Sequence, residues 1–307
     1  MKPIIEPVAT EILEKELSRN KFVRKTNNGN NDIYIITHHD SPNVMREIGR
    51  LRELTFRAAG GGTGEEIDID EFDTSDAAYK QLIVWDPIER EIVSGYRYIK
   101  LGDAPVKNGV VHVATTELFN FSPQFVKEYV PATIELGRSW VQPKYQPSVD
   151  NRKGLFSLDN LWDGLGALVV DNPDVMHFYG KVTMYTDFNF HARDLILAFM
   201  EHFFPDKEKL VTPIEPLGLK TDVSDFLNAI KGLSYKEAHR VLGQRVRENG
   251  EHIPPLVNAY MNLSATMKMF GTALNSHFGE VEETGILVTI ADIYDTKKER
   301  HINTYQK

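Results

Sequence analysis

Charged residues occur in two places where a strand pattern calls for apolar ones. Glu135 and Arg138 lie within ATIELGRSWV at 132–141, an otherwise largely apolar run, and Arg97 lies within IVSGYRYIKL at 92–101. A carboxylate held beside arginines in a buried setting can serve as a general base, because its environment sets its pKa. A structural ion pair between Glu135 and Arg138 would leave the same pattern, so both interpretations stay open.

A second feature is a segment in which acidic side chains crowd together without a basic one. It contains Glu65, Glu66, Asp68, Asp70, Glu71, Asp73 and Asp76. An EF-hand calcium loop starting at Asp68 would need Gly and Glu where Asp73 and Tyr79 stand, so no metal site is predicted. Such crowding is costly unless cations offset it. We therefore expect Asp70 and Asp73 to approach Arg97 or Arg138; a solvated acidic loop is the alternative.

Several catalytic classes lack support in the sequence. The HExxH, GxSxG and Walker patterns are absent. The chain has no cysteine, which removes disulfides, thiolate metal sites and an acyl-cysteine intermediate. His38 and His39 resemble the paired-histidine motif of some acyl-transfer and condensation enzymes, but Asn43 stands where that motif has its aspartate. Asp40 and Ser41 instead predict an N-cap for a helix that starts near residue 42.

Length and composition indicate a globular chain. Its 307 residues are 41% hydrophobic and 26% charged, which excludes a disordered or low-complexity protein. The net charge of −9 argues against a general nucleic-acid binder, since such domains usually carry a surplus of basic residues. Neither a signal-peptide pattern nor a spanning apolar run of about 18 residues is present. We expect a cytoplasmic protein and leave open a peripheral contact with the inner face of the membrane.

Apolar periodicity predicts an α/β (α+β) fold. Strands are expected at 33–37, 81–85, 92–101, 111–119, 132–141, 177–185 and 285–293, and helices at 5–19, 42–57, 157–170, 191–204 and 234–248. This order suits one mixed sheet with helices on both faces. We expect a single domain over 1–307, with a helix and loop at 1–32 and a helical insertion at 205–253. The glycines of GLG at 164–166 predict close packing of the helix that contains them.

In the charged residues described above, the sequence resembles the acyl-carrier-protein-dependent acyltransferases of the GNAT (N-acetyltransferase) fold. The branch it resembles most is that of the ornithine-lipid and glycine-lipid N-acyltransferases, a family also labelled hemolysin and related to the acyl-homoserine-lactone synthases. The resemblance covers about 33–204 and resumes at 253–265 and 285–293. Its shared elements are Arg-x-x-x-Phe at Arg52 and Phe56, Asp-x-x-Asp at Asp70 and Asp73, an arginine at Arg97, and Glu-x-x-Arg at Glu135 and Arg138.

The resemblance implies a GNAT-like, mostly antiparallel sheet flanked by helices, and it implies roles for single residues. Glu135 would be the base, assisted by Arg138 and Arg97, and Tyr185 would be the acid for the leaving thiolate. The acceptor side would comprise Arg52, Phe56, Asp70 and Asp73. At a splay between strands, the donor and its pantetheine would contact Ser139, Trp140, Val141, Arg152 and Lys153, where backbone N–H groups would hold the oxyanion.

The donor is inferred from a missing pattern. Acetyl-CoA enzymes of this fold usually carry Gln/Arg-x-x-Gly-x-Gly/Ala after the fourth strand, where N–H groups cradle the pyrophosphate. The segment at 142–156, QPKYQPSVDNRKGLF, lacks it. The acyl-phosphopantetheine of acyl-carrier protein therefore fits better than acyl-CoA, and no tightly bound cofactor is expected. Acyl-carrier proteins are acidic, so we expect docking on a basic patch drawn from Lys144, Arg152, Lys153, Lys236, Arg240, Arg245 and Arg247.

The leading functional hypothesis is an N-acyltransferase. It would move a fatty acyl group from acyl-carrier protein to the amine of a small amino acid, giving a lyso-aminolipid. One alternative is a CoA-dependent GNAT N-acetyltransferase acting on a small amine. The other is a non-catalytic GNAT-fold binding module, in which the buried charges would be expected to decay.

Overall fold

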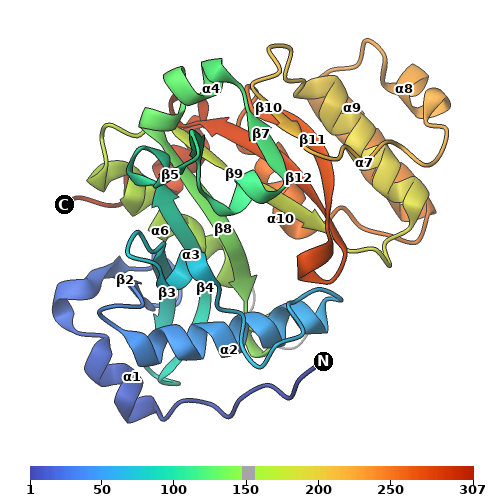
Figure 1. Ribbon diagram of the computed structural model, residues 1–307. Helices are drawn as coiled ribbons and strands as arrows, with labels where there is room; N and C mark the ends of the chain where they lie inside the picture. Colours follow the sequence, from blue (N-terminus) through green and yellow to red (C-terminus); the bar gives the residue numbers. More distant parts are fainter. Residues whose placement is uncertain (147–155) are drawn as a thin grey trace.

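The fold is built on one large sheet with helices on both faces (Figure 1). The computed structural model describes residues 1–146 and 156–307, and within them eight strands pair in the order β1-β2-β3-β4-β8-β9-β12-β11. Neighbouring strands are antiparallel except β8 and β9, which are parallel. The strands are β1 (Phe22–Lys25), β2 (Asp32–Ile36), β3 (Lys80–Asp86), β4 (Glu91–Lys100), β8 (Thr133–Val141), β9 (His177–Met184), β11 (Lys268–Asn275) and β12 (Val281–Thr289). The predicted mixed, mostly antiparallel sheet flanked by helices is confirmed.

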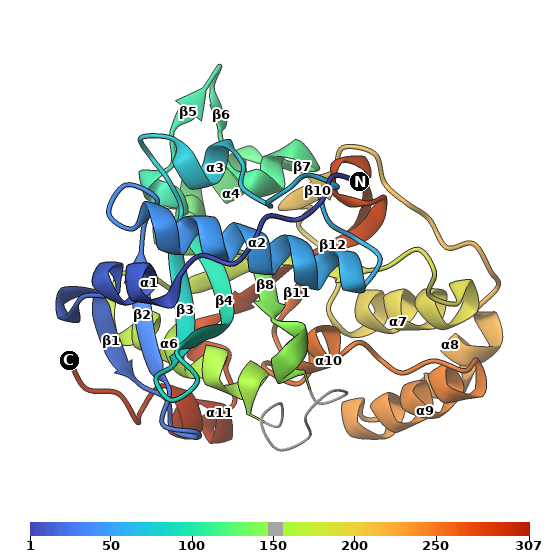
Figure 2. The same cartoon turned by 90° about the horizontal axis from the view of Figure 1, so that it is seen from below.

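The other elements cover this sheet. Two small two-stranded sheets pair β5 (Val106–Lys107) with β6 (Val110–Val111), and β7 (Phe119–Phe121) with β10 (Val211–Pro213). The helices are α1 (Thr10–Glu16), α2 (Pro42–Ala58), α3 (Glu71–Thr74), α4 (Pro123–Glu128), α6 (Ser157–Asp171), α7 (Phe190–Phe203), α8 (Ser224–Ile230), α9 (Tyr235–Glu248), α10 (Pro255–Met261) and α11 (Asp295–His301). Figure 2 shows α2 and α3 on one side of the strands, with α6, α10 and α11 on the other. None of the described helices is both long and apolar enough to cross a bilayer.

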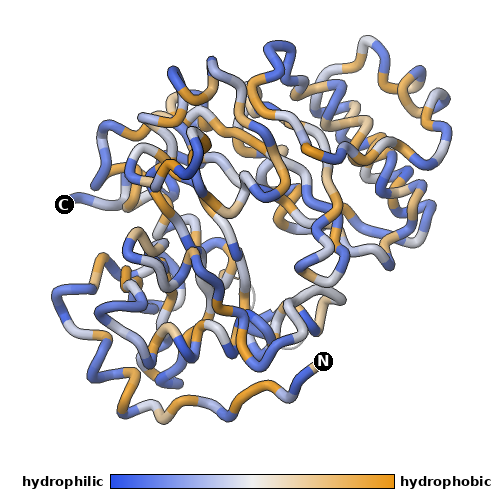
Figure 3. The backbone as a smooth tube through the Cα atoms, in the orientation of Figure 1, coloured by the Kyte–Doolittle hydropathy of each residue, from blue (hydrophilic) through white to orange (hydrophobic). Residues whose placement is uncertain are grey.

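Alternation along the strands divides the core between the two faces. On β3, Leu82 and Val84 join the cluster under α6 and α7, whereas Ile83 and Trp85 pack with α2. This is the period of two expected for a strand that is covered on both faces. The hydropathy tube in Figure 3 shows hydrophobic and hydrophilic residues alternating along the chain, as expected for elements with one buried side.

The start of α2 differs from its predicted capping. Ser41 occupies the N-cap position, but its side chain makes no capping hydrogen bond. The N–H groups of Asn43 and Val44 donate instead to Glu16 Oε2, at 2.9 and 2.8 Å. Asp40 accepts hydrogen bonds from Thr37 and Ser41. A carboxylate from α1 therefore caps α2, and sequence-local rules could not identify it.

Two predicted elements have wrong bounds. The helix predicted at 5–19 spans only Thr10–Glu16, and residues 1–9 form neither helix nor strand. Pro7 disfavours a helical conformation at the residue before it. The strand predicted at 111–119 is interrupted by a 3-10 turn at Ala114–Glu117. In that turn Thr116 Oγ1 bonds the backbone of Val111 and Val113, an alternative to pairing with a neighbouring strand.

The last two strands were also incompletely predicted. β11 was missed because a register shift between Met269 and Thr272, around Gly271 at φ 84°, breaks its alternation. β12 begins at Val281 and ends at Thr289, so the predicted 285–293 is shifted towards the C-terminus. Its first residues include Glu282 and Glu283, whose charges hide the strand although both are buried.

Residues 205–253 contain β10, α8 and α9, so the segment predicted as a helical insertion also contributes a strand. Leu242 and Val246 of α9 belong to the same buried cluster as Ile134 and Leu136 of β8. This shared core supports one domain over 1–307, which stays a prediction together with the bounds of the insertion.

The glycines of α6 permit the close packing expected of them. A Cβ built on Gly164 would lie 2.6 Å from Leu82 Cδ2, and one on Gly166 would lie 2.0 Å from the carbonyl oxygen of His301. The first contact brings α6 onto β3 and the second brings it onto α11. Backbone cannot move aside as a flexible side chain can, so Gly166 has the stronger requirement.

We expect Gly166→Ala to destabilise the protein by about 1–3 kcal/mol or more, the usual cost of overpacking. Gly243→Ala in α9 is the matched control, since its Cβ would meet only the end of the Arg247 side chain at 3.4 Å. There the higher helix propensity of alanine should stabilise by up to about 1 kcal/mol. Urea unfolding of the two variants measures both effects, and equal stability would contradict the packing argument.

Candidate active site

A buried network of charges joins α2, β4 and β8 to the acidic segment. Arg52 of α2 is fully buried and donates from Nε to Asp68 Oδ2 at 3.0 Å and from Nη1 to Asp73 Oδ1 at 3.2 Å. Arg97 Nη1 lies 2.7 Å from both carboxylate oxygens of Asp70 and 3.3 Å from Asp73 Oδ2. The predicted approach of Asp70 and Asp73 to Arg97 is therefore confirmed.

Local structure holds the carboxylates towards these arginines. Asp70 and Asp73 form a capping box at α3, each accepting a hydrogen bond from the backbone N–H of the other. Gln81 Nε2 donates to Asp73 Oδ1 at 2.9 Å. Burial would raise the pKa of Asp73, but Arg52 and Arg97 outweigh it and hold that pKa well below its usual range. The acids are thus ionised partners of the arginines and not a solvated loop.

Arg138 belongs to this network because of an irregularity in β8. The pairing of β4 with β8 shifts in register between Gly95 and Arg97, and Arg138 has φ 46°, a left-handed conformation rare for arginine. Its Nε donates to Asp68 Oδ2 at 2.8 Å, and its Nη2 lies 3.7 Å from Asp70 Oδ2. An ion pair between Arg138 and Glu135, left open by the sequence, is not formed.

Glu135 has hydroxyl partners instead. It is 1% exposed, and its two carboxylate oxygens accept from Tyr79 Oη at 2.8 Å and from Thr115 Oγ1 at 2.7 Å. Burial raises its pKa, although the two hydroxyls and the charges of Lys181 and Arg97 act in the opposite direction. A buried carboxyl with a raised pKa is better matched to proton transfer near neutral pH than an ordinary surface glutamate.

A pocket lies where β8 and β9 separate. Their parallel ladder runs from Thr133 to Leu136 on β8 and ends where Leu136 meets Gly180. Beyond this point β8 continues to Val141 and β9 to Met184 without pairing to each other. The pocket is small and partly open to solvent, and it is lined by Tyr96, Leu136, Gly137, Arg138, Ser139, Phe178, Tyr179, Gly180, Lys181, Leu256, Tyr260, Ile286 and Val288.

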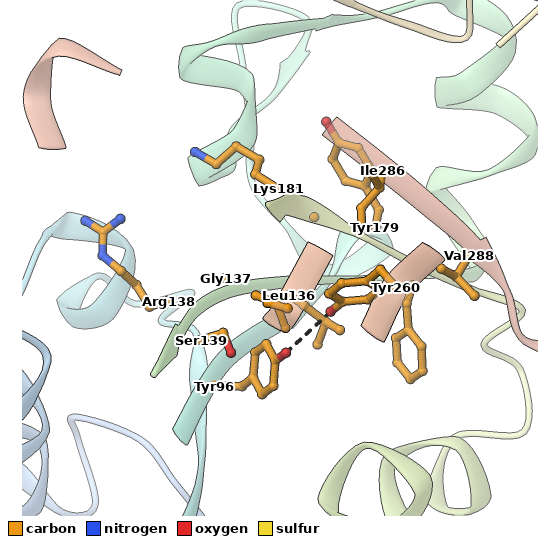
Figure 4. A pocket seen from close by; sticks show the side chains of 13 residues that line it. Tyr96, Leu136, Gly137, Arg138, Ser139, Tyr179, Lys181, Tyr260, Ile286 and Val288 are labelled. Carbon is orange, nitrogen blue, oxygen red and sulfur yellow. Dashed lines mark hydrogen bonds between the residues drawn. The ribbon is translucent and has the colours of Figure 1, made fainter. Parts of the chain in front are cut away.

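The pocket has two chemically different sides (Figure 4). Arg138 and Lys181 extend to one side of the strands, while Tyr96, Ser139 and Tyr260 lie towards the other. The hydroxyls of Tyr96 and Tyr260 are 3.5 Å apart. Leu256, Phe178 and Val288 supply apolar surface nearby. A thioester arm entering the splay would therefore meet polar groups and an apolar wall together.

The predicted donor residues are not all at this pocket. Ser139 lines it, whereas Trp140 is buried in the cluster beneath α2, and Trp140 and Val141 are in register with β4. Arg152 and Lys153 lie outside the described residues. Lys144, expected in the basic patch, forms ion pairs with Glu89 and Glu91.

The predicted acceptor residues and the acid also lie away from the pocket lining. Arg52 is interior, and Phe56 packs edge-on against Phe278, with ring centroids 5.0 Å apart. Tyr185 follows β9 and lies against Gly61, outside the lining residues. Burial, with Glu283 and Asp187 adding to it, raises the pKa of Tyr185 to about 12. The assigned roles of these residues stay predictions.

Sequence reasoning missed five residues that the geometry brings forward: Asp68, Tyr79, Thr115, Lys181 and Glu283. Asp68 was noticed only as one acid among several, yet it receives both Arg52 and Arg138. Its place two residues before the Asp-x-x-Asp pair was the available signal. Tyr79 lies just before the strand predicted at 81–85, and Thr115 lies inside the strand predicted at 111–119. Neither position signalled a polar partner, so only the fold shows that they meet Glu135. Among the described residues, no group of three or more acids and histidines is arranged to hold a metal ion.

This sheet, with a pocket at the splay of two parallel strands, is that of a GNAT-fold acyltransferase. A family model described as an acetyltransferase (GNAT) domain matches residues 51–150. A glycine N(alpha)-acyltransferase of Phocaeicola vulgatus is 53% identical over 309 residues, covering 100% of this chain and 94% of the relative. One of Bacteroides thetaiotaomicron is 54% identical over 306 residues, covering 99% and 91%. No solved structure matches the chain.

The chain belongs to the family of these glycine N(alpha)-acyltransferases. It is an acyltransferase and not a binding module, consistent with its intact buried charges. An enzyme of this class joins an acyl donor to a small amine acceptor.

Removing one arginine from the charge network should lower the stability of the protein. We expect Arg52→Met to lower the free energy of unfolding by about 3–5 kcal/mol, since it leaves Asp68 and Asp73 buried without a partner. Arg300→Met is the matched control: its pair with Asp159 is half-exposed and should be worth at most about 1 kcal/mol. Thermal and denaturant unfolding measure both, and a near-native stability for Arg52→Met would contradict the importance of the network.

Proposed function

We propose that this protein transfers a fatty acyl group from acyl-carrier protein to the amine of glycine, giving an N-acylglycine, which is a lyso-aminolipid. The observation that carries the proposal is the splay pocket between β8 and β9 with the buried carboxyl of Glu135 behind it. The choice of glycine rests on the relatives, which are named glycine N(alpha)-acyltransferases. A long acyl chain is supported by the apolar side of the pocket around Leu256 and Phe178.

In the proposed reaction, the amine nitrogen forms a bond to the thioester carbonyl carbon while the carbon–sulfur bond breaks. Glycine is mostly an ammonium ion near neutral pH, so one proton must leave before attack. Glu135 is the proposed acceptor of that proton. Gly137 lines the pocket and Glu135 lies two residues earlier on the same face of β8, so one bridging water would connect the amine to the carboxylate. A second proton leaves the new amide nitrogen, and the leaving thiolate takes up a proton as it becomes a thiol.

The transition state carries negative charge on the former carbonyl oxygen. Because the ladder with β9 ends at Leu136, the edge of β8 from Gly137 onwards is available to hydrogen-bond a ligand. Backbone N–H groups near Ser139 are the proposed oxyanion donors, and fixed dipoles of this kind are usually the largest single contribution to such catalysis.

The donor is proposed to be acyl-carrier protein because α9 presents a basic surface. Lys236, Arg240, Arg245 and Arg247 are all exposed on this helix. The chain returns from α9 directly to α10, whose Leu256 and Tyr260 line the pocket. A carrier protein bound along α9 would therefore present its acyl-phosphopantetheine close to the splay. The attraction must come from a local surface, since the whole chain has a net charge of −9.

The donor can be tested by comparing long-chain acyl-carrier protein, long-chain acyl-CoA and acetyl-CoA with glycine as acceptor. We expect the highest kcat/KM with acyl-carrier protein, and a decrease as salt rises. Arg240→Glu with Arg247→Glu should lower kcat/KM for that donor and leave acyl-CoA turnover unchanged. Lys127→Glu with Lys207→Glu changes the net charge equally at other exposed sites and is the control. A preference for acetyl-CoA would support the CoA-dependent alternative and refute this donor assignment.

We expect Glu135→Gln to lower turnover by roughly 10² to 10⁴ with little loss of stability. Glutamine keeps an oxygen that accepts a hydrogen bond, and its amide can donate to the hydroxyl of Thr115, so no charge is left unpaired. Wild-type kcat/KM should fall as pH drops through the raised pKa of Glu135, because the protonated carboxyl cannot act as a base. The residual activity of the variant should lack this acidic limb. Full activity with a native melting temperature would overturn the assigned base.

A further inference from the structure

Lys181 and Glu283 form a buried ion pair at the pocket that the mechanism above does not use. Lys181 Nζ of β9 lies 2.5 Å from Glu283 Oε2 of β12, and the two side chains are 13% and 5% exposed. Asn275 Nδ2 also donates to Glu283 Oε2, at 3.3 Å. Glu283 is thus contacted by side chains from both β9 and β11, whereas Lys181 is contacted by Glu283 of β12.

The sheet places Lys181 at the start of the splay. Gly180 is the last residue of β9 that pairs with β8, and Lys181 is the next residue. Tyr179 is in register with Glu135, and alternation puts the Lys181 side chain on the same face as Tyr179 and Glu135. Figure 4 shows Lys181 extending to that side. Its ammonium group therefore lies on the side of the pocket where the proposed base is buried.

Two cationic side chains, Arg138 and Lys181, occur in the described lining of the pocket. The Arg138 guanidinium is already shared between Asp68 and Asp70 and lies 4.0 Å from the centroid of the Phe278 ring. The ammonium of Lys181 has three N–H donors and one acidic partner, so it can bind a second carboxylate. Lys181 is therefore the cation better able to accept a new anionic ligand.

We propose that Lys181 binds the carboxylate of the acceptor amino acid and that Glu283 is a positioning residue that fixes the ammonium group. The inference rests on the proposed function, which makes the acceptor an amino acid. In an α-amino acid one carbon separates the amine from the carboxylate. The cation that binds the carboxylate must then lie beside the thioester carbonyl, and Lys181 lies at the splay where the carbonyl is expected. Lys181 would thus select α-amino acids over simple amines.

The test compares glycine with glycinamide, which has the same amine but no carboxylate, as acceptors for whichever donor supports turnover. Rates are expressed per concentration of unprotonated amine, because the two amines differ in basicity. We expect wild-type kcat/KM to favour glycine by about 30-fold or more, the effect of losing a buried charge-paired contact. Lys181→Met should remove this preference by raising KM for glycine. Because Lys181 also lowers the pKa of Glu135, the comparison is made on the alkaline plateau of the pH profile, where glycinamide should change less than about threefold. Lys181→Arg should restore part of it.

Lys268→Met is the control, since Lys268 of β11 lies on the same sheet, pairs with Glu208 in a more exposed setting and does not line the pocket. It should keep the wild-type preference. Glu283→Gln should weaken glycine binding less than Lys181→Met does, with the same sparing of glycinamide. An equal loss of both acceptors in a folded Lys181→Met protein would overturn the inference.

If Lys181→Met does not fold, the wild-type comparison of glycine with glycinamide still tests whether the enzyme has a carboxylate site, because it needs no variant. A wild-type enzyme that uses glycinamide as well as glycine has no carboxylate site, which overturns the inference while glycine acylation itself stands. A wild-type enzyme that acylates neither glycine nor another α-amino acid overturns the proposed function, and the inference with it. Lys181→Gln, whose amide can still donate to Glu283, provides a second substitution for the kinetic split.

Discussion

The architecture depends on neutralising two buried arginines and one partly buried arginine with the carboxylates of one short segment. Arg52, Arg97 and Arg138 come from α2, β4 and β8, and they converge on Asp68, Asp70 and Asp73. Removing such charges from water is expensive unless the partners are placed with good geometry. Each element must therefore keep its position relative to the other two, and the capping box at α3 aims the acids at all of them. The network fixes one end of β8 before any ligand binds.

That constraint explains the shape of the pocket. Arg138 adopts a left-handed backbone conformation, which non-glycine residues rarely do, and its contact with Asp68 supplies the compensation. The register irregularity lies just beyond Leu136, the point at which the ladder with β9 ends. A bulge bends the strand that contains it, so β8 can follow β4 while it leaves β9. The splay is thus a consequence of how Arg138 is held, and Glu135 remains on the regular part of the strand with its own hydroxyl partners.

Much of the sheet could be predicted because its central strands are regular, whereas the partners within the site could not. The hairpin of β3 and β4, the strand β8 and the helix α6 follow clean periodicities, and their predicted bounds agree closely with the structure. The charged residues of the site were recognised as anomalies in apolar runs. Glu135 and Arg138 are three residues apart and would point to opposite faces of a regular strand. Only the bulge, which has no signature in the sequence, shows that Arg138 turns towards Asp68. Tyr79 and Thr115 depend on long-range folding in the same way.

The two adjacent glutamates of β12 show how charge can fix the register around the pocket. Glu282 points to the face of α7, where Arg193 Nε donates to it at 2.6 Å and Lys220 Nζ at 3.2 Å. Glu283 points to the opposite face and pairs with Lys181. A slip of one residue would exchange the two faces and leave both glutamates buried without their cations. The same register places Ile286 and Val288 in the lining of the pocket. The two buried glutamates therefore fix both the apolar wall and the cationic side of the pocket.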